Sequence, residues 1–141
     1  MQIRNPRTLE VSHTAWVRKL KATGNILYAG AYSVTNIPGH PDPCVKVVFP
    51  LPNGNAIVLM KVIARPDGSL ALQSIGESFG SPGFYFVVHG QDGRIWARYV
   101  KSLKEEISVY EAETDTVRAD HRLWFYGKEF LRLHYRMQKH R

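Results

Sequence analysis

The sequence predicts a mainly β protein: a curved antiparallel meander or barrel of eight to nine strands with one short N-terminal helix. The first observation is a ladder of turn signals, Asn53-Gly54, Asp67-Gly68, Gly90 to Gly93, Thr114-Asp115 and Gly127-Lys128. Asn-Gly and Asp-Gly supply the positive φ angles of tight antiparallel turns. The second is that short stretches rich in Val, Ile, Phe, Tyr and Trp separate these turns. A sheet this wide normally closes or curls, because a flat one would expose long edges.

Length and composition bound the class of protein. With 141 residues, of which 44% are hydrophobic, the chain has the size of a single domain over 1–141 with a sizeable core. The lone Cys44 excludes an intramolecular disulfide and any site built from several thiolates. No apolar run approaches roughly 18 residues, and the N-terminus lacks the apolar stretch of a signal peptide, so a cytoplasmic location is expected. The net charge of +7 favours anionic partners.

The N-terminal part is expected to contain the helix. Residues 1–8 are expected to form a flexible lead-in, and residues 9–22 an amphipathic helix that Gly24 ends. The apolar residues whose spacing suggests one helical face are Leu9, Trp16, Val17 and Leu20.

The remainder, 25–137, is expected to form antiparallel strands. The expected strands are 25–34, 44–50, 56–64, 69–76, 83–89, 94–103, 105–113, 116–126 and 130–137. Three prolines forbid a central strand in the loop 36–43, and a glycine-dense segment, 76–83, forms a wide connection. Residues 138–141 form a basic tail.

Hairpin register predicts which side chains meet, because side chains alternate between the two faces of a strand. A three-residue loop at 127–129 would pair His121 with Tyr135 and place apolar residues together on the inner face. A three-residue loop at 114–116 would pair Glu111 with Ala119, which makes Glu111 a diagonal neighbour of His121.

Glu111, His121 and Tyr135 therefore form the candidate ligand-binding set on an otherwise apolar inner face. We expect the protein to bind a small hydrophobic or amphipathic molecule, whose polar end these residues contact. Alternatively, the same set serves proton transfer in an isomerase, cyclase or dehydratase, since the pKa of a histidine lies near neutrality. A third interpretation is that His121 is a hydrogen-bonded core residue and Glu111 lies in water at the rim.

A basic and aromatic outer face offers a further function. Charge that follows a phosphate backbone, with rings that stack on bases, is typical of single-stranded nucleic-acid binding. The residues concerned are Arg122, Trp124, Arg132 and Arg136. The same pattern also suits an anionic surface, or a solvated face with ordinary packing of Arg on Trp.

No cofactor or metal site is expected from the motifs. Segment 76–83 lacks the Gly-Lys-Ser/Thr ending of a phosphate loop. His40, Asp42 and Cys44 could ligate a metal, but prolines flank them and no second cluster follows at the spacing that structural sites use.

Three segments resemble an uncharacterised bacterial domain often appended to saccharopine-dehydrogenase-like proteins. They are VYEAETDTVRADHRL with LRLHYR within 109–137, ESFG with FYF within 77–86, and PCVKVVF at 43–49. The match covers 26–137 in pieces. It implies an all-β domain and no activity.

Overall fold

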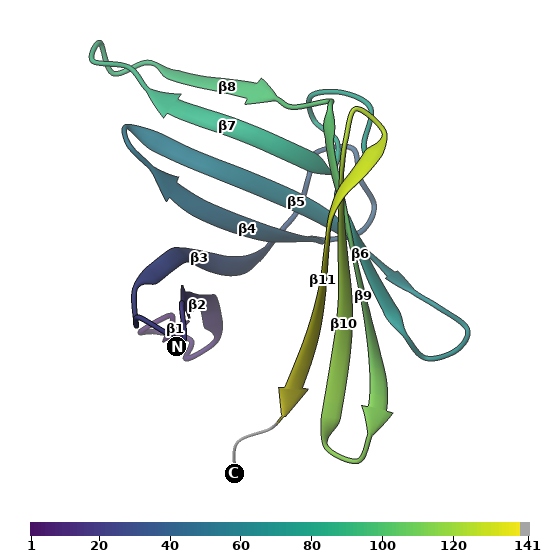
Figure 1. Ribbon diagram of the computed structural model, residues 1–141. Helices are drawn as coiled ribbons and strands as arrows, with labels where there is room; N and C mark the ends of the chain where they lie inside the picture. Colours follow the sequence, from purple (N-terminus) through teal and green to yellow (C-terminus); the bar gives the residue numbers. More distant parts are fainter. Residues whose placement is uncertain (139–141) are drawn as a thin grey trace.

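The computed structural model describes residues 1–138, apart from the side chains of Leu27 and Tyr28. Within that part the chain forms eleven strands that belong to one antiparallel sheet (Figure 1). They are β1 (Gln2–Arg4), β2 (Val11–Lys19), β3 (Ile26–Thr35), β4 (Cys44–Leu51), β5 (Gly54–Ala64), β6 (Leu70–Gln73), β7 (Gly83–His89), β8 (Ile95–Tyr99), β9 (Leu103–Glu113), β10 (Thr116–Phe125) and β11 (Lys128–Gln138). The mainly β, antiparallel prediction is confirmed, and the nine strands expected after residue 24 all occur with bounds shifted by a few residues. In the same part of the chain no helix is long and apolar enough to cross a membrane.

The predicted N-terminal helix over 9–22 is wrong, since β2 occupies this segment. The structure leaves Leu9 68%, Val17 51% and Leu20 43% exposed, so three of the four apolar residues that suggested a helical face cover no core. Trp16 and Arg18 are instead partly buried with Val17 exposed between them, which is the period-two alternation of a strand. Pairing of β2 with β3 overrides the helical spacing.

The expected lead-in 1–8 contains β1, which pairs with β2 from Gln2↔Thr14 to Arg4↔Val11. The N-terminal ammonium donates a hydrogen bond to the Ala15 carbonyl oxygen over 2.8 Å. The expected basic tail, 138–141, lies outside the described residues except for Gln138 at the end of β11.

The sheet is curled but not closed, so the barrel alternative of the prediction is wrong, and the strands number eleven instead of eight to nine. Its path runs β1-β2-β3-β4-β5-β6-β9-β10-β11, and in Figure 1 the two ends of this path stand apart. The path also branches at β5, which pairs with β7 over residues 54–59 and with β6 over residues 61–64. The β7–β8 ribbon therefore extends as an arm instead of joining a ring.

The core lies at this branch. Val47, Val58 and Met60 are buried, Met60 completely, and partly buried neighbours from β3, β6, β7 and β9 pack on them. Met60 lies between the segment of β5 that pairs with β7 and the segment that pairs with β6. Both β6 and β7 therefore leave β5 next to this buried side chain.

Cys44 provides a test of this packing. Its side chain is buried, and burial, followed by the negative charge of Asp42, raises the pKa of the thiol, while Lys61 lowers it in part. Since the thiolate is the reactive form, we expect Ellman's reagent at mildly alkaline pH to label the native protein at least ~100-fold more slowly than the unfolded chain. Labelling of the native protein at the unfolded rate would contradict the buried position.

Candidate functional site

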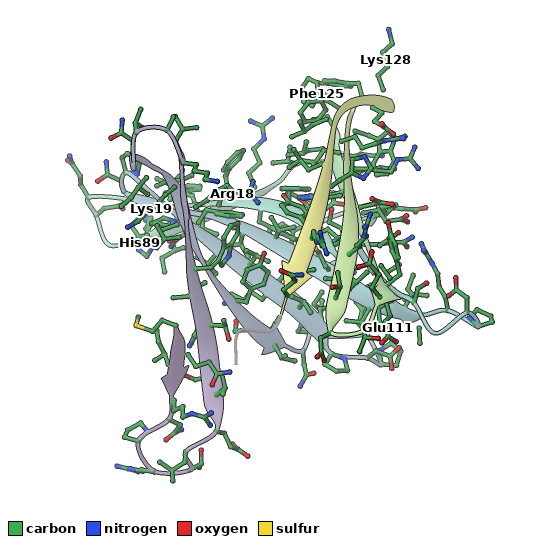
Figure 2. All side chains as sticks on the ribbon, turned by 60° about the horizontal axis from the view of Figure 1, so that its bottom comes forward. Arg18, Lys19, His89, Glu111, Phe125 and Lys128 are labelled. Carbon is green, nitrogen blue, oxygen red and sulfur yellow. The ribbon has the colours of Figure 1, made fainter. Side chains whose placement is uncertain are left out.

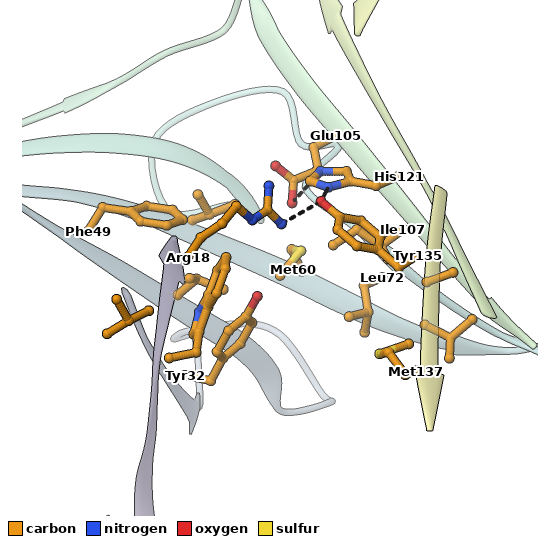
Figure 3. A pocket seen from close by; sticks show the side chains of 16 residues that line it. Arg18, Tyr32, Phe49, Met60, Leu72, Glu105, Ile107, His121, Tyr135 and Met137 are labelled. Atoms are coloured by element: carbon orange, nitrogen blue, oxygen red, sulfur yellow. Dashed lines mark hydrogen bonds and ion pairs between the residues drawn. The ribbon is translucent and has the colours of Figure 1, made fainter. Parts of the chain in front are cut away.

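A cavity of about 470 Å³ lies inside the curve of the sheet (Figure 3). Side chains from β2, β3, β4, β5, β6, β9, β10 and β11 line it, and most of the lining is apolar. Apolar residues of the wall include Val47, Phe49, Val58, Met60, Leu72 and Ile107. Polar side chains interrupt this wall, and four of them lie next to one another: Arg18, Glu105, His121 and Tyr135.

The polar side chains form a continuous chain across one part of the wall. Arg18 donates a hydrogen bond from Nη2 to the Tyr135 hydroxyl over 2.8 Å, and that hydroxyl lies 3.4 Å from His121 Nδ1. On the other side of the imidazole, Nε2 lies 3.4 Å from Glu105 Oε1. Figure 3 shows the four groups in this order, at the cavity.

Burial makes the His121–Glu105 contact unusual. The side chain of Glu105 is 9% exposed and that of His121 16%. His121 Nε2 is fully buried and makes no hydrogen bond to any described residue, because the geometry toward Glu105 is poor although the distance permits an ion pair with a protonated ring. Buried polar groups are nearly always hydrogen-bonded, so this nitrogen at the cavity wall is an exception that a bound polar group could satisfy.

Arg18 connects β2, the second strand of the path, with β11 at its other end. Its guanidinium lies 5.2 Å from the ring centroid of Trp16, on its own strand, and 5.2 Å from that of Tyr135 on β11. Such distances allow cation–π attraction on both sides. β2 and β11 are thus connected by side chains at the seam where the sheet does not close.

His121 and Tyr135 meet as the sequence predicted, but Glu111 does not join them. β9 and β10 are joined by the two-residue turn Thr114-Asp115 and a bulge, so that Glu111 lies opposite Val117 and His121 opposite Ile107. Glu111 is exposed near that turn, and Figure 2 shows it far from Phe125 and Lys128 at the other end of the ribbon.

Glu105 takes the place predicted for Glu111. The register differs from the expected one by two residues, which keeps every side chain on its predicted face but brings the other end of β9 toward His121. Glu105 shares a face with Ile107 and Val109, and this alternation is visible in the sequence. The register between β9 and β10, which decides that Glu105 lies beside His121, is not. Arg18 was missed because its segment was interpreted as a helix.

The β10–β11 register is displaced in the same way. The loop is Tyr126-Gly127, with φ of 48° and 79°, instead of the expected three residues at 127–129. His121 therefore pairs with Leu133, and Tyr135 becomes its diagonal neighbour.

The predicted outer basic face exists, but carboxylates neutralise much of it. Glu129 accepts hydrogen bonds from Arg122 Nε at 2.7 Å and from Arg132 Nε at 3.0 Å. Glu113 lies 3.5 Å from Nη2 of Arg136. The Arg122 guanidinium covers the ring of Trp124 at 4.9 Å. Arg122, Trp124, Arg132 and Arg136 thus form an ion-paired, packed surface that is less available to phosphates.

Glu129 carries a pH prediction. Hydrogen bonds from Arg132 and then Arg122 lower the pKa of its carboxyl. The ionised Glu129 carboxylate therefore stabilises the folded protein fully above the ordinary glutamate pKa of about 4.3. This stabilisation is lost as the pH falls through the lowered pKa that Glu129 has in the folded state. We expect Arg132→Ala to raise the Glu129 pKa in a carboxyl-carbon NMR titration. Arg118→Ala, which removes a partner of Glu113 instead, should leave it unchanged; equal effects would contradict the assignment.

Residues 1–138 hold no group of three or more His, Cys, Asp or Glu side chains arranged to bind a metal ion. Comparison of the chain with family models, with curated proteins and with solved structures found no match. Any functional conclusion therefore depends on the geometry of the cavity and of the surface.

Proposed function

We propose that the protein binds one small hydrophobic or amphipathic molecule in the interior cavity. The observation that carries this proposal is a 470 Å³ apolar cavity whose wall includes a connected set of polar groups. Ligand sites of proteins are typically about 300–1,000 Å³, mostly apolar, with a few polar groups that fix orientation. The body of the ligand would contact side chains such as Met60 and Ile107.

The polar end of the ligand would lie against Glu105, His121 and Tyr135. Glu105 offers a nearly buried acceptor, and His121 Nε2 lacks a hydrogen bond among the described residues. A hydroxyl group suits both, because it donates one hydrogen bond and accepts others. The seam between β2 and β11 would admit the ligand, since side chains alone connect the two strands there.

Blocking the cavity tests the proposal. Met137 lines the cavity on the same face of β11 as Tyr135 and is 45% exposed, so Met137→Trp would fill the entrance without disturbing the core. We expect this change to weaken binding of a dansyl-labelled long-chain probe by about tenfold or more, the cost of about 1.4 kcal/mol of lost contact. Val62→Trp is the matched control, because Val62 is similarly exposed, at 39%, but lies outside the lining.

Equal binding by both variants and the wild type would place the probe elsewhere. Absence of probe binding, together with native mass spectra without a retained small molecule, would end the proposal.

A second candidate function is proton transfer on a carbonyl-bearing molecule held in the same cavity, as in an isomerase, cyclase or dehydratase. The observation that favours it is an imidazole with a carboxylate near one nitrogen and a phenol near the other. In such an arrangement the carboxylate orients the ring, and the ring exchanges a proton with the ligand. Deuterium uptake from heavy water into a molecule recovered from the cavity, present with wild type and absent with His121→Phe, would support this candidate. Uptake unaffected by the substitution would dismiss it.

A further inference from the structure

A second concave surface lies away from the interior cavity, between the β7–β8 arm and the β10–β11 turn. This groove encloses about 610 Å³ and is open to solvent. Its lining includes Phe86 of β7, Arg98 and Tyr99 of β8, Lys101 between β8 and β9, Lys104 of β9, and Tyr126 of the β10–β11 turn. The backbone holds the two sides together, since Tyr126 N donates to the Ser102 carbonyl oxygen over 2.8 Å.

The charge of the groove is uncompensated. Arg98, Lys101 and Lys104 line it, its lining contains no Asp or Glu, and among residues 1–138 none of these cations forms a salt bridge. The outer face of β10 and β11 differs, because Glu113 and Glu129 pair with four of its arginines. Anion binding is therefore favoured in the groove over the outer face.

Exposed rings accompany these cations. Phe86 is 46% and Tyr126 78% exposed, and both line the groove. Trp96, 61% exposed, lies two residues before Arg98 on β8 and so on the same face of the arm. These large rings leave much of their apolar surface uncovered by the described chain, so the rings and the unpaired cations beside them are available to a partner.

We propose that this groove binds single-stranded nucleic acid, with the phosphates on Arg98, Lys101 and Lys104 and the bases on the rings of Phe86, Trp96 and Tyr126. Positive grooves lined with aromatic side chains bind single strands in this manner, because every base presents a face for stacking. A flat bilayer fits the concave surface poorly, and an acidic peptide would use the cations but not the faces of the rings. This site is independent of the interior cavity.

Fluorescence anisotropy of a labelled short oligothymidylate tests the charge requirement. The variant Arg98→Ala/Lys101→Ala/Lys104→Ala removes three groove cations, and Arg118→Ala/Arg132→Ala/Arg136→Ala removes three paired arginines with the same change in net charge. We expect the groove variant to lose at least about tenfold in affinity at low salt and to show a shallower salt dependence, since fewer counterions are released. The outer-face variant should change affinity less than about threefold, because its arginines are already neutralised by carboxylates.

Equal losses in the two variants would overturn the groove assignment, as would no binding by the wild type. Should the triple groove variant fail to fold, Lys101→Glu alone serves, because Lys101 is exposed in a turn; it should weaken binding, and unchanged affinity would overturn the proposal.

The ring requirement separates nucleic acid from other polyanions. Tyr126 has a φ of 48°, a conformation that asparagine tolerates, so Tyr126→Asn removes the ring and keeps the turn. We expect this variant to bind oligothymidylate about fivefold to tenfold more weakly and to bind inorganic polyphosphate as the wild type does. Equal affinity of wild type and variant for oligothymidylate would show a site for polyanions in general and would overturn the nucleic-acid assignment.

Discussion

Replacement of Gly54 by alanine is expected to be among the most damaging single changes in this protein. Gly54 begins β5 and lies between Leu51 of β4 and Val88 of β7. A Cβ atom there would collide with the Val87 carbonyl oxygen and would lie 2.9 Å from the Val87 carbonyl carbon. Backbone cannot swing aside as a side chain can, so one strand must move, and we expect the free energy of unfolding to fall by about 3 kcal/mol.

Gly93→Ala is the matched control for this prediction, measured by urea denaturation. Gly93 has a φ of 76°, yet no atom lies within 4 Å of an added Cβ. Only the left-handed backbone would then be strained, at a cost of about 1 kcal/mol. If Gly54→Ala is no more destabilising than Gly93→Ala, the close approach of β7 to this position is wrong.

Gly54 also shows what a turn signal can and cannot predict. Asn53-Gly54 correctly places a hairpin between β4 and β5, but the loop consists of Pro52 and Asn53, and Asn53 carries the positive φ of 60°. Glycine is needed at position 54 because a third strand passes close by. That strand, β7, comes from almost thirty residues later in the chain, and a local pattern contains no information about it.

The same division between local and long-range information explains which strands of the fold could be predicted from the sequence and which could not. The nine strands after residue 24 could be predicted because turn residues and alternating side chains are local properties. β2 could not, because Trp16, Val17 and Leu20 fit a helical spacing as well as a strand, and only the partner β3 decides between them. Of the predicted meander or barrel, the barrel is wrong because β5 divides its edge between two neighbours, which no single segment reveals.

The candidate site could be predicted by face but not by position along the strand. Bulges at Thr116/Val117 and at Leu123/Trp124 accompany a displacement of the register by two residues on both sides of β10. Since two is the period of a strand, His121 stays on the inner face and near Tyr135, while its carboxylate neighbour becomes Glu105.

The His121–Glu105 contact leads to the second large prediction, a double-substitution cycle. His121→Leu alone would leave the nearly buried Glu105 without its only side-chain partner among residues 1–138, and breaking a buried pair in this way costs about 3–5 kcal/mol. Glu105→Leu/His121→Leu should regain most of that stability, because replacing both members of a buried pair by apolar residues is often neutral or stabilising. Urea denaturation of the two single variants and the double variant measures the coupling.

An exposed pair of the same chemistry is the control for this cycle. His134 Nδ1 lies 2.5 Å from Asp120 Oδ1, but the His134 side chain is 68% exposed, so His134→Leu should cost less than about 1 kcal/mol. Equal costs for His121→Leu and His134→Leu would contradict a role for burial.

The doubly substituted protein also separates a ligand site from a polar core pair that only stabilises the fold. If Glu105 and His121 hold the polar end of a ligand, the double variant should bind a long-chain alkane as the wild type does. It should bind the corresponding alcohol about tenfold more weakly, the value of one or two lost hydrogen bonds. If the pair serves only the fold, the ratio of the two affinities will be the same in both proteins. The ratio is informative because it does not depend on the stability of the variant, and the alkane reports that the cavity itself remains intact.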